Sequence, residues 1–280
     1  MICERLLKLA RTLLVEPVAD PQFIDLAWRI FFQEKLRGIE IEAHFPWIKK
    51  SKPNIWYVTL REDDKVIGGA LVKELKFSTL NFNFIIGVVG LICIDPEFRG
   101  CGLAKEMLAL LITESRSKHY DALTLWSSKH KVYSPHGFSV NDRTFYGAVD
   151  MLAYERHGQQ KLKFQHYNLP KHLGLPPFAV RGECYSNDMA DIRVVYDNYG
   201  PILVDWNGDI QYALCLIESV LPMNFRMNTY TNDKLPCMLE KYSGKLTLTK
   251  SNLQMWNILH NKYEASHIID NAHFSILDRI

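Results

Sequence analysis

One stretch of the 280-residue sequence, Leu91–Leu111, arranges its residues in the way that phosphate binding requires. It opens with an apolar run that is typical of a strand buried on both faces, and an Asp-Pro pair ends this strand. Gly100 and Gly102 then predict a tight turn, and apolar residues spaced by three and four predict a helix from Leu103. A strand, a glycine turn and a helix in this order leave free main-chain N–H groups at the positive end of the helix dipole. Such an arrangement is a site for a phosphate-bearing ligand.

The glycine spacing narrows the choice of phosphate ligand. The stretch contains no GxxxxGK[ST] loop, and Gly100, Gly102 and Ala104 do not form a GxGxxG fingerprint. Instead, residues 99–104 (RGCGLA) resemble the R/Q-x-x-G-x-G/A turn with which the GNAT superfamily of N-acetyltransferases binds the pyrophosphate of acetyl-CoA. The preceding residues 95–98 (DPEF) resemble the lead-in to that turn. The resemblance implies acetyl-CoA as the co-substrate.

A second motif resembles the same superfamily. Residues 133–138 (YSPHGF) are similar to its Y-x-x-x-G-F segment, and they follow a predicted helix ending near His119 and a predicted strand over residues 122–126. Residues 29–34 (RIFFQE) also resemble the R-x-V-F-x-E segment of its first helix. The resemblance covers about residues 20–150 and gives no information on the rest of the chain.

The resemblance implies a role for particular residues. The main chain of Ile92, Cys93 and Ile94 would hold the pantetheine arm and polarise the acetyl carbonyl, with Ile92 N–H facing the oxyanion. The diphosphate would be bound by the residues of the turn and the first helical turn, namely Arg99, Gly100, Cys101, Gly102, Leu103, Ala104 and Lys105. Tyr133 is the predicted catalytic acid, which protonates the departing thiolate; the alternative is an aromatic packing residue.

The general base stays open at this point. An alkyl amine with a pKa of about 10.4 is mostly protonated at neutral pH, so a base or a water chain must remove its proton. Glu40, Glu42, His44 and Glu74 are the candidates, although an ordinary surface charge is the simpler explanation of each. Residues 126–128 (WSS) depart from the asparagine-containing segment that often follows this strand in the superfamily.

Arg99 and Cys101 of the turn each have more than one possible role. Arg99 can add positive charge near the phosphates or brace the turn through an ion pair. Cys101 lies near the cofactor in the predicted site, but a covalent mechanism would need an oriented histidine beside it, and the sequence indicates none.

Composition limits the classes of function. A hydrophobic share of 48% with 23% charged residues is ordinary for a soluble globular protein. A net charge of +2 provides no electrostatic basis for a nucleic acid or an anionic membrane as partner. The six scattered cysteines contain no C-x-x-C pair, and the histidines lack metal-site spacing, which predicts a cytoplasmic protein without disulfides or metal. Apolar residues at helical spacing predict an amphipathic helix over residues 3–16. Because the segment lacks a signal-peptide cleavage pattern, we expect this helix to be retained.

Periodicity gives a coarse order of elements along the chain. Before residue 153 we predict a helix over 20–36, a hairpin of 55–60 with 66–72, a long strand over 82–94 interrupted at Gly87 and Gly90, and a strand over 144–152 that closes the first domain. After residue 177 we predict strands over 178–184, 202–206, 223–231 and 246–249, and helices over 186–196, from Asp209 and from Asn252. The Asn207-Gly208 pair leaves a hairpin open as an alternative to the helix from Asp209.

The predicted fold class is therefore α/β, with a GNAT-type mixed, mostly antiparallel twisted sheet flanked by helices and a second, smaller α/β domain. The predicted domains are 1–152, a linker over 153–177, and 178–280, for which a decayed repeat is conceivable but a structural or acceptor-recognition module is favoured. The predicted function is acetyl-CoA-dependent transfer of an acetyl group to a primary amine on a small molecule or peptide, directly within a ternary complex. A monomer or homodimer without nucleic-acid or membrane partners is expected. The alternatives are transfer of longer acyl chains and an inactive CoA-binding regulatory or scaffold protein.

Overall fold

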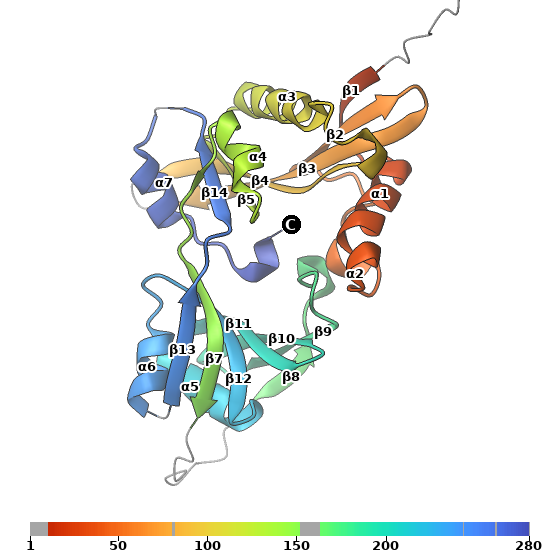
Figure 1. Cartoon of the computed structure of the whole chain (residues 1–280). Helices are drawn as coiled ribbons and strands as arrows, with labels where there is room; N and C mark the ends of the chain where they lie inside the picture. Colours follow the sequence, from red (N-terminus) through yellow and green to blue (C-terminus); the bar gives the residue numbers. More distant parts are fainter. Residues whose placement is uncertain (1–10, 80–81, 152–162, 243, 261, 280) are drawn as a thin grey trace, which may run out of the picture.

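The fold consists of two seven-stranded sheets, one formed mainly by the first half of the chain and one mainly by the second (Figure 1). The computed structural model describes residues 11–79, 82–151, 163–242, 244–260 and 262–279. The predicted α/β class, with a mixed and mostly antiparallel sheet flanked by helices, is confirmed, and both halves have a sheet of this kind.

The first sheet has the strand order β1-β2-β3-β4-β5-β14-β6. Its pairs are antiparallel except for β4 and β5, which run parallel. The strands are β1 (Arg11–Glu16), β2 (Ile55–Glu62), β3 (Lys65–Ser78), β4 (Asn83–Ile94), β5 (Ala122–Trp126), β14 (Gln254–Ile258) and β6 (Ser139–Val140).

Helices cover both faces of the first sheet. α3 (Leu103–Ser117) buries Met107 and Leu111 against one face, and α1 (Pro21–Phe31) and α7 (Ala265–Asn271) cover opposite ends of the other face. α1 begins where Asp20 accepts a hydrogen bond from Gln22 N–H, and a proline at its first position suits the helix start. The apolar core therefore lies on both faces of β2–β5.

Short helical turns complete the first half. They are η1 (Gln33–Lys35), α2 (Ile41–His44), η2 (Pro96–Phe98), α4 (His130–Tyr133) and η3 (Ser134–His136). Together, α1 and η1 confirm the helical prediction for residues 20–36, with a break at Phe32.

The second sheet has the order β13-β7-β12-β11-β10-β9-β8. Its strands are β13 (Gly244–Lys250), β7 (Thr144–Met151), β12 (Asn224–Tyr230), β11 (Gly200–Gly208), β10 (Ala190–Asp197), β9 (Arg181–Ser186) and β8 (Gln165–Asn168). α5 (Ile210–Val220) and α6 (Leu235–Tyr242) share one apolar core with this sheet. A second core lies around Leu277 of η5 (Ile276–Asp278) and contains Val195, Ile202 and Val204.

The two halves repeat one topology. In the first half, the hairpin β3-β4 is followed by the crossover helix α3 and the parallel strand β5; in the second, β10-β11 is followed by α5 and the parallel strand β12. The repeat that the sequence left open is therefore present in the order of the elements.

Two strands cross between the halves, which the sequence did not predict. β7 (Thr144–Met151) exists as predicted, but it pairs with β12 and β13 in the second sheet instead of closing the first. The helix predicted from Asn252 is wrong, because Gln254–Ile258 forms β14 between β5 and β6. Met255, Trp256 and their neighbours are buried on both faces, so pairing across the sheet outweighs the local helical pattern. The division into two domains remains a proposal, with these strands exchanged across it.

Two further helix predictions are wrong. Within the range 3–16, the described residues Arg11–Glu16 form β1, whose pairing with β2 supplies backbone partners that an isolated helix would lack; residues 1–10 lie outside the described residues. The helix predicted over 186–196 is instead a tight turn followed by β10, because the Asn187 side chain accepts hydrogen bonds from Met189 and Ala190 N–H. The helix from Asp209 is confirmed as α5.

Connecting segments join the halves. η4 (Lys171–Leu173) lies within the predicted linker, and Leu175 N–H donates to Ala43 O at 3.0 Å in the first half. η5 packs on the second sheet and lies between the halves in the view of Figure 1. The space between the sheets is thus bounded by elements from distant parts of the chain.

Candidate active site

The central strand β4 of the first sheet contains an irregularity in its pairing with β3. Along β3, Leu71 pairs with Gly90 and Gly69 pairs with Cys93, so Leu91 and Ile92 together stand opposite one residue, Ala70. This is a β-bulge, and Leu91 adopts a positive φ of 50°, which is uncommon and strained for a non-glycine residue. Strain of this kind is often retained where a strand serves a ligand.

The bulge coincides with the point where β4 leaves its other neighbour. β4 pairs with β5 only over Ile86–Val88, so the main chain beyond Val88 has no strand partner on the β5 side. The predicted pantetheine-binding residues Ile92, Cys93 and Ile94 all lie in this gap, with their β5-side backbone unpaired by any described strand. An extended ligand with amide groups can pair with such an edge.

The turn after β4 leads directly into α3. Gly100 and Gly102 have φ values of 84° and 79°, which favour glycine, and no described atom lies within 4 Å of a Cβ added at either position. Gly102 is the N-cap of α3, and no side chain caps this end of the helix. The backbone bonds of α3 begin with Lys105 N–H to Gly102 O at 2.9 Å. The turn therefore presents exposed, open main-chain N–H groups at a helix N-terminus.

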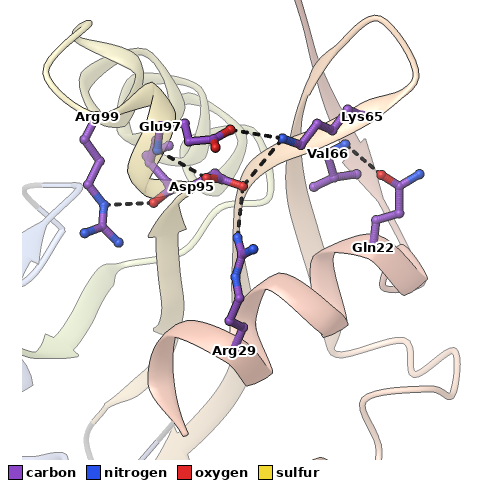
Figure 2. Close-up of polar contacts among 8 residues, drawn as sticks. Gln22, Arg29, Lys65, Val66, Asp95, Glu97 and Arg99 are labelled. Atoms are coloured by element: carbon purple, nitrogen blue, oxygen red, sulfur yellow. Dashed lines mark hydrogen bonds and ion pairs between the residues drawn. The ribbon is translucent and has the colours of Figure 1, made fainter. Parts of the chain in front are cut away.

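The start of the turn is braced from α1. Arg29 Nη2 lies 2.9 Å from Asp95 Oδ2, and Lys65 Nζ lies 3.9 Å from the same atom and 3.6 Å from Glu97 Oε2 (Figure 2). The buried Asp95 carboxylate also accepts a hydrogen bond from Glu97 N–H at 3.2 Å. Burial raises the pKa of Asp95, but these donors outweigh it and hold the pKa below its usual value. Asp95 and Glu97 are thus structural, as their positions at the strand end suggested.

Arg99 braces the turn in a way that the sequence did not predict. Its Nε donates to Ile94 O at 3.0 Å, at the end of β4 (Figure 2). Among the described residues it forms no ion pair within 4.0 Å, so a main-chain carbonyl takes the place of the ion pair that the sequence suggested. Binding of phosphate by Arg99 stays a prediction.

Tyr133 is the last residue of α4. Its ring packs edge-on against Phe138 at 6.1 Å and against the core under α3. Burial raises the pKa of the Tyr133 phenol, and a side-chain hydrogen bond with Ser127 partly opposes the rise. A phenol held in its protonated form beside the end of β5 has the chemistry of a proton donor.

The loop that carries Tyr133 is held by β14. Asn257 Nδ2 donates to His136 O at 2.8 Å, and Gly137 turns there with a φ of 86°. The Ser127 N–H donates to Leu253 O at 2.8 Å, so the residue beside Tyr133 is also fixed from the same late segment. Sequence reasoning missed these contributions, since the alternation in Gln254–Ile258 was the only signal and it was read as helix.

Three of the four candidate bases, Glu42, His44 and Glu74, already have partners, and Glu40 is the N-cap residue of α2. Glu42 pairs with Lys49, and Glu74 lies 3.4 Å from Lys76 Nζ. The buried His44 ring accepts a hydrogen bond from Ile39 N–H at Nε2, 3.2 Å away, and its Nδ1 lies 3.0 Å from Leu175 O. An accepting Nε2 requires the proton on Nδ1, so both ring nitrogens are occupied: Nε2 by Ile39 of the same half and Nδ1 by Leu175 of the segment between the halves.

Two absences concern only the residues that the structure describes. No group of three or more His, Cys, Asp or Glu side chains lies close enough to hold a metal ion there. No helix in the same part of the chain is long and apolar enough to cross a membrane. Cys93 is buried, which raises the pKa of its thiol to about 12, so only its main chain suits the predicted role.

A cavity of about 690 Å³ lies elsewhere on the first sheet. Its lining includes Asn83 and Ile85 at the start of β4 and Asp121 before β5, at the opposite end of these strands from the bulge. None of the predicted site residues line it. Its volume alone would favour this cavity as the cofactor site. The unpaired main-chain N–H groups and the strained bulge instead favour the turn after β4, which lies on an open surface, as that site.

Comparison with known proteins agrees with the geometry of the turn. Residues 21–138 match the family model described as the acetyltransferase (GNAT) family, a range that contains α1, the bulge, the turn and the Tyr133 loop. No curated protein matches the sequence significantly.

Solved structures resemble both halves together. A GCN5-related N-acetyltransferase from Kribbella flavida is 11% identical, with a TM-score of 0.65 over 88% of this chain and 71% of that one. A protein of unknown function from Enterococcus faecalis V583, titled a probable N-acyltransferase, is 10% identical, with a TM-score of 0.64 over 89% of this chain and 73% of that one. Eis1 from Mycobacterium abscessus is 11% identical, with a TM-score of 0.60 over 90% and 74%. At these identities the similarity establishes the fold, including the paired arrangement of the two halves.

Proposed function

We propose that this protein transfers an acetyl group from acetyl-CoA to a primary amine, directly within a ternary complex, because residues 21–138 match the model of the GNAT acetyltransferase family. The observation that carries the proposal is the continuity of three features: the bulge at Leu91, the unpaired edge of Ile92–Ile94 and the uncapped turn at Gly102. They follow one another along the chain in the order in which a thioester, a pantetheine arm and a diphosphate occur in acetyl-CoA.

Each feature has a defined task in this proposal. The N–H groups of residues 100–104 and the positive end of α3 bind the diphosphate, with Lys105 adding charge from the first helical turn. The unpaired main chain of Ile92, Cys93 and Ile94 pairs with the amides of the pantetheine, and Ile92 N–H faces the acetyl carbonyl oxygen. Holding both substrates in reacting geometry lowers the activation free energy by roughly 7–11 kcal/mol, so the reaction needs few catalytic side chains.

Tyr133 completes the reaction as the acid. The amine nitrogen attacks the acetyl carbon, the tetrahedral intermediate collapses, and the C–S bond breaks as the phenol gives its proton to the thiolate sulfur. The raised pKa of Tyr133 keeps this proton in place at neutral pH, and Ser127 orients the hydroxyl. Both ring nitrogens of His44 already have hydrogen-bond partners, so His44 is not available as the base. We propose that a chain of water molecules in the gap between β4 and β5 removes the proton of the amine.

The experiment combines two measurements on the purified protein. Calorimetry with acetyl-CoA measures cofactor binding, and release of free thiol over a panel of primary amines measures transfer. Tyr133→Phe is expected to lower kcat by about a hundredfold or more, as for loss of a general acid, with the Kd for acetyl-CoA unchanged. An unchanged kcat in this variant would show that Tyr133 is not the acid. A lack of acetyl-CoA binding by the wild type would contradict the proposed acetyltransferase activity as a whole.

Two alternatives produce other results in the same assay. An inactive CoA-binding scaffold would bind acetyl-CoA without releasing thiol in the presence of any amine. An enzyme for longer acyl chains would release thiol faster with a longer acyl-CoA than with acetyl-CoA. Acetyl is preferred because the core around the gap is filled by buried side chains, including Leu91 and Val89.

The expected setting is a cytoplasmic one, with a monomer or homodimer that has neither nucleic acid nor membrane as partner. Cys93, Cys101, Cys184, Cys215 and Cys237 are all free thiols in the described part of the chain, which suits a reducing compartment. The net charge of +2 provides no strong field for a polyanionic partner.

A further inference from the structure

A guanidinium with unused donors lies between the two halves. The Nε and Nη2 atoms of Arg279, which follows η5, are buried and have no hydrogen-bond partner among the described residues. Arg279 also forms no ion pair within 4.0 Å in that part of the chain. Burial lowers the pKa of Arg279 to about 10, which reflects the cost of keeping this charge away from water.

The nearest carboxylates are already in use. Asp142 accepts from Thr144 N–H at 3.0 Å and Thr144 Oγ1 at 2.6 Å, and from the N–H groups of Leu253 and Gln254 at 2.8 and 3.0 Å. Asp278 accepts from Ser275 N–H at 3.0 Å in the capping box of η5. Both act on Arg279 only through their charge, so its fork of N–H groups remains free.

An aromatic donor accompanies the guanidinium. The Arg279 guanidinium carbon lies 5.2 Å from the centre of the Trp126 ring, and the Trp126 Nε1 atom is likewise buried without a partner among the described residues. Stacking on the ring orients the planar fork. Three donor nitrogens from two neighbouring side chains are thus buried without an acceptor among the described residues.

One of these donors is one residue away in the chain from the residue that bonds to Tyr133. Trp126 is the last residue of β5, and the following residue, Ser127, bonds to Tyr133. Successive strand residues point to opposite faces, and Trp126 packs with Phe274 on the face away from α3. The donors therefore face the side of the sheet from which an acceptor can approach while the turn and α3 hold the cofactor.

A second cation lies in the same space. Lys73 of β3 is held with its Nζ 5.9 Å from the Trp47 ring centre, and burial lowers the pKa of this amine. The single carboxylate that acts on it, among those described, is Asp278, which also neighbours Arg279. The Lys73 amine and the Arg279 guanidinium thus share Asp278 as a neighbouring carboxylate.

We propose that Arg279 and Trp126 bind a carboxylate carried by the amine acceptor, so that the substrate class is an amino acid or a peptide with a free carboxyl group. This inference rests on the proposed function. A carboxylate has one negative charge and two oxygens, which matches one guanidinium fork and one indole N–H. Binding this group places the amine of the same molecule on the acceptor side of the gap, close to the Tyr133 loop.

The test compares acceptors that differ only in the carboxylate. β-Alanine and L-lysine are assayed against their amides by free-thiol release, with the wild type, Arg279→Met, Arg279→Lys and the exposed control Arg116→Met. The acids are expected to have a kcat/KM about ten- to a hundredfold above the amides, mainly through KM, as for hydrogen bonds to a charged group. Arg279→Met removes this preference, leaves the amides unchanged and keeps the melting temperature equal or higher, because a buried unpaired charge is lost. Arg279→Lys retains part of the preference, and Arg116→Met retains all of it.

The outcomes separate this inference from the proposed function. Equal kcat/KM for acids and amides in the wild type would overturn the inference and leave the acetyltransferase intact. A large fall in the melting temperature of Arg279→Met and Arg279→Lys, with equal losses for acids and amides, would also overturn it, since Arg279 would then be structural. If no acceptor releases thiol, calorimetry with β-alanine and its amide decides: binding of the acid alone, lost in Arg279→Met, supports the site, and no binding of either overturns it.

Discussion

The turn after β4 and the turn after β11 occupy equivalent places in the two halves, yet only one is open. The first has Gly102 as an uncapped N-terminus of α3, with no described atom within 4 Å of an added Cβ. In the second, Asp209 caps α5 with its own carboxylate, accepting from Gln211 N–H at 2.8 Å and Tyr212 N–H at 3.4 Å. The protein itself therefore occupies the anion site of the second half. The fold thus has an open turn and a closed turn at equivalent places, which differ in whether a side chain caps the following helix.

The bulges show the same contrast. Each half has one extra residue on the central strand, Leu91–Ile92 opposite Ala70 in β4 and Val204 in β11. Leu91 has a φ of 50°, whereas Val204 does not have a positive φ. The strained bulge and the open turn occur together in the first half, and the second half has the same architecture without either feature.

The largest expected effect comes from closing the open turn. Gly102→Asp places a carboxylate at the N-terminus of α3, as Asp209 does for α5, and competes with the diphosphate for the same N–H groups. We expect acetyl-CoA to bind at least about a hundredfold more weakly by calorimetry, as for the loss of hydrogen bonds to a charged group.

Gly102→Asn is the matched control. Asparagine and aspartate both tolerate a positive φ, so Gly102→Asn and Gly102→Asp impose a similar strain on the backbone. Only Gly102→Asp adds a negative charge. Equal weakening by both substitutions would show that the turn acts through its shape and would contradict the electrostatic explanation.

A smaller effect is expected from opening the closed turn. Asp209→Ala removes the cap of α5 and should lower the free energy of unfolding by about 1 kcal/mol, measured by denaturant titration. Acetyl-CoA affinity should not change, because this turn takes no part in binding. A change in acetyl-CoA affinity as large as that expected for Gly102→Asp would contradict the claim that only the turn before α3 binds the cofactor.

A pH-dependent effect tests the contact that His44 makes with Leu175 between the halves. Burial lowers the pKa of His44 below its ordinary value of 6.5, so the unfolded chain binds a proton there at a pH at which the folded chain does not. The free energy of unfolding should therefore fall as the pH decreases below about 6.5, by up to roughly 1.4 kcal/mol per pH unit for one proton. His44→Gln should flatten this dependence, and the exposed His172→Gln should leave it unchanged. A dependence that persists in His44→Gln would assign it to another group, such as His273, whose pKa burial also lowers.

The sequence predicted the first half's site region far better than the second half. The turn at residues 99–104 and the Tyr133 loop are encoded by local residue types, since glycine, proline and capping residues determine backbone shape within a few positions. β14 could not be found in this way, because the partners that make Gln254–Ile258 a strand lie more than a hundred residues earlier in β5 and β6. Arg279 and Trp126 were missed for the same reason: neither has a local motif, and only the fold brings them together.

The exchange of β7 and β14 has a consequence for biosynthesis. β6 has its only described ladder with β14, so the first sheet cannot close until the ribosome has added residues 254–258. The nascent first half must wait with the edge of β5 uncovered, and an exposed edge invites pairing with neighbouring chains. Separate expression of either half would therefore yield an incomplete sheet, whereas co-expressed fragments could complement each other by supplying the missing strand.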